Sequence, residues 1–142
     1  MGESQLDLLE RLLSRLDHYA TEVSRQQIES DLDTWLKVSR ALELVAQCCL
    51  DLAMEMVAKR GLGVPETYRE AFVRLAQDGL LTQEQSTALQ SWAGLRNVLA
   101  HLYASIDLDR LHGAMIEDKK VLREFGRIAA RELFEDEGSL SG

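Results

Sequence analysis

The chain has 142 residues, of which 46% are apolar and 28% are charged, and its formal net charge is −8. This length and composition fit one soluble domain with a single apolar core. The acidity argues against a broad electropositive surface for non-specific nucleic-acid binding, but it permits a local basic cleft. The sequence has no apolar run near the ~20 residues of a membrane span and no basic-then-apolar leader, so we expect a cytoplasmic protein without a membrane partner.

The first half of the sequence predicts two long helices. Apolar residues recur with the 3.6-residue helical period over residues 3–23, and a polar turn or frayed extension is expected at 25–30. Asp31 or Asp33 can cap a second helix that ends at Lys59, before Gly61. The apolar face of this helix is too wide for one neighbour, which predicts a central position. It comprises Leu32, Trp35, Leu36, Leu42, Val45, Cys49, Leu52 and Met56.

The second half predicts a short helix over 66–77, a long helix over 83–103 and a continuous fifth helix over 108–134. Thr82 and Gln85 have the spacing of a capping box at the start of the 83–103 helix. The expected fold is therefore all-α, an up-down bundle of four long helices and one short helix. Residues 1–134 would form the single domain, and 135–142 a frayed acidic tail.

The sequence offers no convincing metal site or disulfide. Cys48 and Cys49 are adjacent, so in a helix they point about 100° apart and are poorly placed to bridge each other. His18, His101 and His112 do not form a helical i, i+4 pair. We therefore expect reduced, buried cysteines and chemistry that needs no metal ion.

Reactive side chains concentrate at the end of the 83–103 helix, in the run Arg96-Asn97-Val98-Leu99-Ala100-His101-Leu102-Tyr103. Asn97 and His101 share a helix face, and Arg96 and Tyr103 are nearly eclipsed on an adjacent stripe. Arg96 and His101, however, lie about 140° apart around an ideal helix. Either the helix distorts here, or a second copy of the chain completes the site in a two-fold dimer.

The chemistry of this run suits phosphate. Arginine binds phosphate oxygens in a bidentate manner and stabilises developing charge, and histidine exchanges protons near neutrality. In RNA the 2′-hydroxyl supplies the nucleophile, so neither a metal ion nor a covalent enzyme intermediate is needed, and metal-independent RNA cleavage fits these residues. The competing interpretation is a surface ion pair for Arg96 and a favourable contact of His101 with the helix dipole.

The Arg-x(4)-His-x-Tyr pattern resembles the signature of the HepT-like toxins of the HEPN superfamily, and the similarity extends over about residues 36–134. Leu102 departs from the family, in which glycine is frequent at this position. The segments that carry the resemblance are Ala58-Lys59-Arg60-Gly61-Leu62, Val64-Pro65-Glu66-Thr67-Tyr68, Ala71-Phe72, Leu75-Ala76 and Gly94–Tyr103, followed by Ile106-Asp107.

The resemblance implies a helical homodimer whose paired motif helices form a ribonuclease cleft. Arg96 and His101 would be catalytic, with Asn97 in support and no cofactor for cleavage. The implied partner is a minimal nucleotidyltransferase (MNT) antitoxin of a type VII-like toxin–antitoxin system, which uses ATP to add AMP to Tyr103. A bulky phosphate group beside Arg96 would block the cleft.

Two alternatives remain open at this stage. Positive residues recur at four-residue steps in the last helix, either as an RNA phosphate track or as a solvated face offset by nearby glutamates; they are Lys119, Arg123, Arg127 and Arg131. For the whole chain, the alternative is a non-catalytic helical partner or substrate-presenting subunit of a nucleotidyltransferase. The net charge of −8 favours that alternative, whereas the intact Arg96–His101 pair favours the enzyme.

Overall fold

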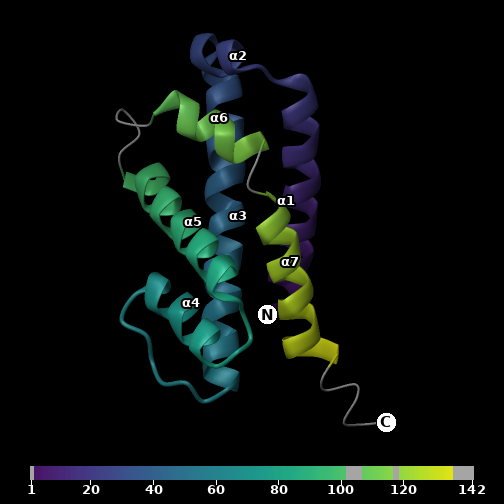
Figure 1. The fold of residues 1–142 in the computed structure, drawn as a ribbon. Helices are drawn as coiled ribbons and strands as arrows, with labels where there is room; N and C mark the ends of the chain where they lie inside the picture. The colour runs from purple at the N-terminus through teal and green to yellow at the C-terminus, as the bar shows by residue number, and fades with distance from the viewer. Residues whose placement is uncertain (1, 102–106, 117–118, 136–142) are drawn as a thin grey trace.

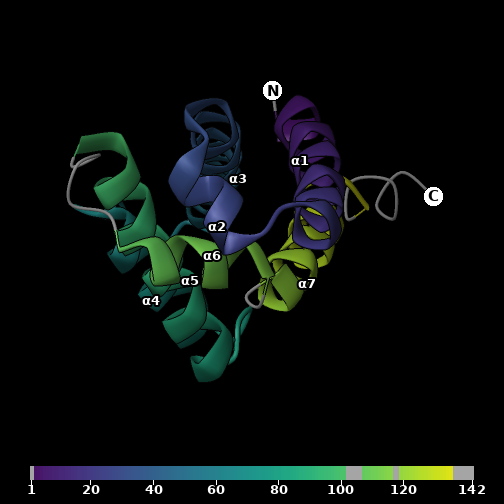
Figure 2. The same cartoon turned by 90° about the horizontal axis from the view of Figure 1, so that it is seen from above.

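The computed structural model describes residues 2–101, 107–116 and 119–135, and within these ranges all regular structure is helical (Figure 1). The helices pack side by side as one bundle, as the view from above also shows (Figure 2), which confirms the predicted all-α class. In chain order the elements are α1 (Gly2–Glu22), α2 (Arg25–Ser30), α3 (Leu32–Lys59), α4 (Tyr68–Gln77), α5 (Gln83–His101), α6 (Leu108–Ile116), α7 (Lys119–Ala130) and a final π-helical segment, Arg131–Glu135. Among the described helices, none has the length and apolarity needed to cross a bilayer.

Helix α3 is central, as its wide apolar face predicted, because α1, α4, α5 and α7 all pack against it. Two residues expected on that face are nevertheless exposed: Leu32 is 70% and Leu36 is 48% accessible. Both lie in the first two turns of α3, where the C-terminal part of α5 leans away from α3 (Figure 1). Their apolar surface is therefore left uncovered in a single copy of the chain.

Residues 25–30 form the short helix α2 rather than the expected turn. Its start is fixed by a capping box, in which the Ser24 hydroxyl accepts from the Gln27 backbone at 3.1 Å and the Gln27 side chain accepts from Ser24 N at 2.8 Å. Buried Ile28 anchors the helix to the core. The Ser-x-x-Gln spacing, which is visible in the sequence, is the pattern that predicts this capping box and the start of a helix.

The prediction of one continuous helix over 108–134 is wrong, because this stretch forms two helices that run in different directions (Figure 1). Helix α6 packs against α1, α2 and α3, whereas α7 packs against α1, α3 and α5. Each buries its own apolar residues, with Leu111 and Met115 in α6 and Leu122 and Phe125 in α7. A single straight helix cannot reach both sets of neighbours, so tertiary packing divides it.

The N-terminal half of α5 is firmly positioned. The predicted capping box is present, with Thr82 and Gln85 exchanging two hydrogen bonds of 3.0 Å. One turn later, the fully buried Ser86 hydroxyl donates to the carbonyl oxygen of Phe72 in α4 at 3.0 Å. The Phe72 ring meets that of Phe125 edge to face, with centroids 5.8 Å apart. The capping box and the Ser86 hydrogen bond thus fix the start of α5 against α4, and the Phe72–Phe125 contact joins α4 to α7.

Candidate active site

Arg96 lies on α5 with its guanidinium uncommitted to any carboxylate among the described residues. Its Nη1 donates to Oδ1 of Asn97, the next residue, at a long 3.3 Å. Its Nε is buried and has no acceptor within the described part of the chain. A buried donor without a partner is costly, so this arginine is held ready for an acceptor from outside the single described chain.

His101 is the last residue of α5 and is exposed, as is Asn97. No hydrogen bond or ion pair joins His101 to another described residue. The two side chains lie four residues apart on one stripe of the helix, as the sequence predicted. No described residue therefore competes with a ligand for the imidazole. Leu102 and Tyr103 lie outside the described residues.

Arg96 and His101 are not brought together within one copy. Helix α5 is continuous from residue 83 to 101, so over this range the helix does not distort to bring them together. The five-residue spacing therefore keeps its angular separation of about 140°. The described part of α5 thus excludes helix distortion as the route to a joint site.

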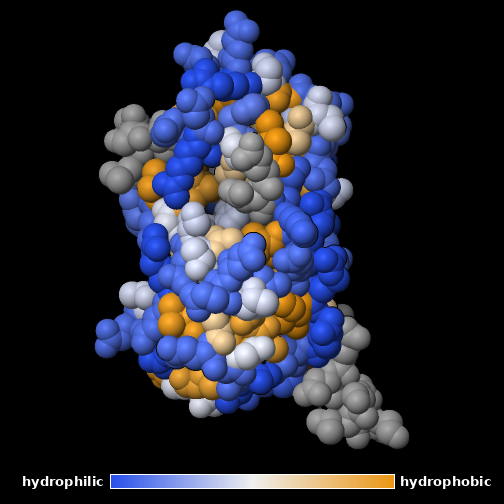
Figure 3. All heavy atoms as spheres, viewed as in Figure 1, coloured by the Kyte–Doolittle hydropathy of each residue, from blue (hydrophilic) through white to orange (hydrophobic). Residues whose placement is uncertain are grey.

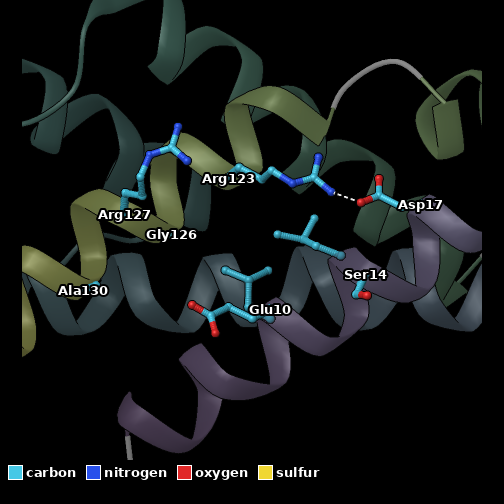
Figure 4. A pocket seen from close by; sticks show the side chains of 9 residues that line it. Glu10, Ser14, Asp17, Arg123, Gly126, Arg127 and Ala130 are labelled. Atoms are coloured by element: carbon cyan, nitrogen blue, oxygen red, sulfur yellow. Dashed lines mark hydrogen bonds and ion pairs between the residues drawn. The ribbon is translucent and has the colours of Figure 1, made fainter.

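The predicted basic stripe runs along α7 into the π-helical segment that follows it, and its members have different surroundings. Lys119 is only 7% exposed and donates to Asp17 Oδ1 of α1 at 2.8 Å. Arg123 pairs with the other carboxylate oxygen of the same residue (Figure 4). The hydrogen bond from Lys119 is the main reason that the pKa of Asp17 is lowered, and Arg123 adds to it. Lys119 and Arg123 thus join α7 to α1.

Arg127 and Arg131 differ from the first two members of the stripe. Both are exposed, and neither makes a hydrogen bond or ion pair with another described residue. Figures 1 and 2 place α7 and the C-terminal end of α5 on opposite sides of the molecule. Arg127 and Arg131, which are unpaired among the described residues, therefore do not lie beside His101 of the same copy (Figures 1 and 2).

A hollow of about 370 Å³ lies between α1 and α7, beside this stripe (Figure 4). Leu9 and Leu13 line it together with Gly126, and Glu10 and Arg127 flank it. It is remote from Arg96 and His101, which do not line it. Figure 3 shows that the surface on the face viewed in Figure 1 is mainly hydrophilic, with apolar atoms gathered in a band across its lower half.

The described residues hold no group of three or more histidine, cysteine, aspartate or glutamate side chains arranged to bind a metal ion. Cys48 and Cys49 are free and buried. Burial raises the pKa of the Cys48 thiol to about 11, with a further contribution from Asp51, and burial raises that of Cys49 still more. Neither cysteine is therefore a thiolate nucleophile near neutral pH.

Sequence reasoning missed two arginines beside the motif. Arg69 of α4 and Arg110 of α6 both reach the surface of α5 at Gly94. Their only signal in the sequence is a glycine inside a long helix, where glycine costs stability and so indicates a close approach.

The all-α bundle and the motif at the end of α5 define a HEPN-type helical protein. The family model of HepT-like ribonucleases matches residues 9–127, and the chain belongs to that family. It is 29% identical over 106 residues to the mRNA nuclease HepT of Shewanella oneidensis, covering 75% of this chain and 78% of the relative. It is 30% identical over 113 residues to the tRNA nuclease HepT of Aphanizomenon flos-aquae, covering 80% and 76% of the two chains.

A solved structure with the same fold is the tri-AMPylated HEPN toxin of Shewanella oneidensis in complex with MNT antitoxin. Its chain is 26% identical to this one, with a TM-score of 0.81 and coverage of 92% of this chain and 97% of the other. The relatives named above thus include both nucleases and a toxin bound to its antitoxin.

Proposed function

We propose that this protein is the toxin of a type VII-like toxin–antitoxin system and acts as a metal-independent endoribonuclease. The observation that carries the proposal is the state of Arg96 and His101: both lie on α5, and neither is neutralised by another described residue. A purely structural bundle has no need of an arginine with a buried, unpartnered Nε. Because the chain belongs to a family of ribonucleases, we assign these two side chains to RNA cleavage.

The cleavage step uses the RNA's own 2′-hydroxyl. His101 exchanges the proton of the 2′-hydroxyl or of the departing 5′-oxygen, and Arg96 stabilises the negative charge that develops on the phosphoryl oxygens. The new 2′-O–P bond forms as the 5′-O–P bond breaks. The products are a 2′,3′-cyclic phosphate and a 5′-hydroxyl, with no net change in atoms, so no cofactor is required.

We place the reaction in a cleft shared by two copies of the chain. The angle between Arg96 and His101 prevents one helix from presenting both to the same phosphate, whereas two-fold pairing of α5 supplies both from opposite sides. Exposed Leu32 and Leu36 on α3 are apolar surface available to such a dimer. In this arrangement Asn97 holds the Arg96 guanidinium in place.

Control of the toxin is assigned to Tyr103, the target of AMP addition by a cognate MNT antitoxin that uses ATP. Tyr103 is two residues beyond His101 in the sequence, so an adenylate there adds negative charge and bulk close to the cleft. The AMPylated state of the related Shewanella toxin in its complex with MNT supports this assignment. Within the basic stripe, the proposed RNA contacts are Arg127 on α7 and Arg131 in the segment that follows it.

The second candidate function is a non-catalytic partner or substrate-presenting subunit of the nucleotidyltransferase. The net charge of −8 favours it, because an acidic surface disfavours RNA. This candidate predicts that neither the wild type nor the Arg96 and His101 variants cleave RNA. The toxin proposal predicts that the wild type cleaves RNA and that these two variants do not.

The test is cleavage of total RNA in EDTA by the wild type, Arg96→Ala and His101→Ala, with His112→Ala as a control histidine on α6. Fragments ending in 2′,3′-cyclic phosphate are expected from the wild type and from His112→Ala only. Mass spectrometry first establishes that Tyr103 is unmodified. An unmodified, folded wild type that cleaves no RNA would overturn the toxin proposal in favour of the second candidate.

Mixing the two inactive variants tests the shared cleft. If Arg96 of one copy acts with His101 of the other, a mixed dimer of Arg96→Ala and His101→Ala retains one intact site. Random exchange then restores about a quarter of the wild-type activity. If both residues act within one copy, each site of the mixed dimer lacks one of them, and the mixture stays inactive.

A further inference from the structure

Two guanidinium groups converge on the middle of α5 from opposite sides. A Cβ atom built on Gly94 would lie 2.5 Å from Nη2 of Arg69 and 3.8 Å from Nη2 of Arg110. The two nitrogens are thus at most about 6 Å apart, a separation at which like charges repel. Figure 1 shows their helices, α4 and α6, on either side of α5. The missing side chain of Gly94 provides the space for the Arg69 guanidinium, and Arg110 lies at ordinary contact distance from the same point.

No carboxylate offsets this pair in the described part of the chain, since neither Arg69 nor Arg110 makes a hydrogen bond or ion pair there. Arg60 and Arg74 differ in this respect, since Arg60 pairs with Asp78 and Glu132, and Arg74 pairs with Glu70. Two exposed arginines that meet at Gly94 without a carboxylate partner among the described residues can bind an anion with several oxygens, such as a phosphate group.

A second observation concerns the surroundings of Arg110. Arg110 lines a small cavity of about 40 Å³ between α5 and α6, together with Trp92 and Ser91. Trp92 is 3% exposed, and its Nε1–H is buried without an acceptor among the described residues. Buried indole N–H groups usually donate to an acceptor. The Trp92 N–H can therefore donate to a ligand or water oxygen as its partner.

The position of the pair relates it to the motif. Gly94, Asn97 and His101 are spaced i, i+3 and i+7, so they form one stripe along α5. The seven residues from Gly94 to His101 correspond to about 10 Å along the helix axis. An RNA strand that presents its scissile phosphate to His101 and runs back along this stripe passes over Arg69 and Arg110.

We propose that Arg69 and Arg110 form a phosphate-binding site for the RNA backbone, next to the scissile phosphate. The proposal rests on the proposed ribonuclease function, for which it supplies a substrate-positioning site. It assigns the pair to backbone contact without base recognition, because guanidinium groups bound to phosphate carry no sequence information. A local pair of positive charges also explains how a chain with a net charge of −8 binds RNA.

The test measures RNA binding separately from cleavage. A fluorescein-labelled single-stranded 20-nucleotide RNA is titrated with the full-length His101→Ala protein, which cannot cleave, and anisotropy is recorded at several salt concentrations. In this background, Arg69→Ala with Arg110→Ala is expected to weaken binding about tenfold near 0.1 M salt. The slope of log K against log salt should fall in magnitude by about 1.4, or about 0.7 for each lost contact.

Two further variants separate the site from general charge effects. Arg11→Ala with Arg15→Ala removes the same charge from exposed positions on α1 and is expected to leave binding within about twofold of the parent. Gly94→Ala keeps every charge, but its Cβ displaces the Arg69 guanidinium, so binding should weaken severalfold. Thermal stability should not fall in Gly94→Ala, because alanine is the better helix former.

Failure of this site and failure of the proposed function give different results. If the wild type cleaves RNA but the Arg69/Arg110 variant retains parental affinity and salt slope, the phosphate site is overturned and the ribonuclease stands. An equal loss in the Arg11/Arg15 control also overturns the site. If the unmodified wild type neither binds nor cleaves RNA, both proposals fall.

Discussion

Asp17 offers the sharpest test of how α1 and α7 are held together. Its two carboxylate oxygens receive Lys119 and Arg123, and Lys119 is almost fully buried. Asp17→Asn keeps the shape but removes the charge, which leaves the Lys119 ammonium buried without a counter-charge. A charge-assisted hydrogen bond contributes about 1.5–3 kcal/mol, but the Asp17 side chain is half exposed, so solvent reduces this value. We expect a loss of about 1–2 kcal/mol at pH 7.

The loss should depend on pH in a defined direction. The pKa of Asp17 is lowered in the folded protein, mainly by the hydrogen bond from Lys119. Its contribution is therefore complete above the unfolded pKa of about 3.9 and is lost as the pH falls through the lower folded value. The wild type and Asp17→Asn should differ fully at pH 7 and pH 5.5, and the difference should shrink as the pH falls below about 4.

The assay is urea unfolding followed by circular dichroism, at fixed protein concentration because association would add to the stability. The matched control is Lys119→Met, which removes the buried cation and keeps the length of the side chain. In that background Asp17→Asn should cost less than half as much, since only the exposed Arg123 contact is lost. Equal stability of Asp17→Asn and wild type at pH 7, or a difference that persists unchanged at pH 3, would refute the reasoning.

Two predictions concern the core. Phe72→Ala removes a fully buried ring that contacts Phe125, and should destabilise the protein by about 3–5 kcal/mol in urea unfolding, whereas Phe72→Leu should cost much less; similar losses for both would contradict a packing role. Burial raises the pKa of Cys48 to about 11 and that of Cys49 further, so at pH 8 only about a thousandth of Cys48 is thiolate. Mass spectrometry should find both cysteines unmodified after native treatment with iodoacetamide and both alkylated in urea, and rapid native labelling would disprove their burial.

Local sequence signals were sufficient where a structure depends on neighbours in the chain. The Thr82–Gln85 capping box, the stop of α3 after Lys59 and the central position of α3 all follow from spacing within one helix. The all-α class follows from the helical period of the apolar residues, and the family resemblance follows from motifs of consecutive residues. The identity of the candidate residues Arg96 and His101 is likewise a property of the sequence, because their chemistry belongs to the side chains themselves.

The features that only the tertiary structure revealed depend on contacts between elements that are distant in the chain. The division of residues 108–134 into α6 and α7 arises because two sets of neighbours must be covered, and periodicity within one segment does not report those neighbours. The same holds for Lys119, for which a solvated position is one of the two expectations from the sequence. In the structure it pairs with Asp17, which is 102 residues away in the chain. Arg69 and Arg110 come together only because α4 and α6 flank α5 at Gly94. Sequence periodicity determines which face of a helix is apolar, whereas packing alone determines which charged groups from different helices meet.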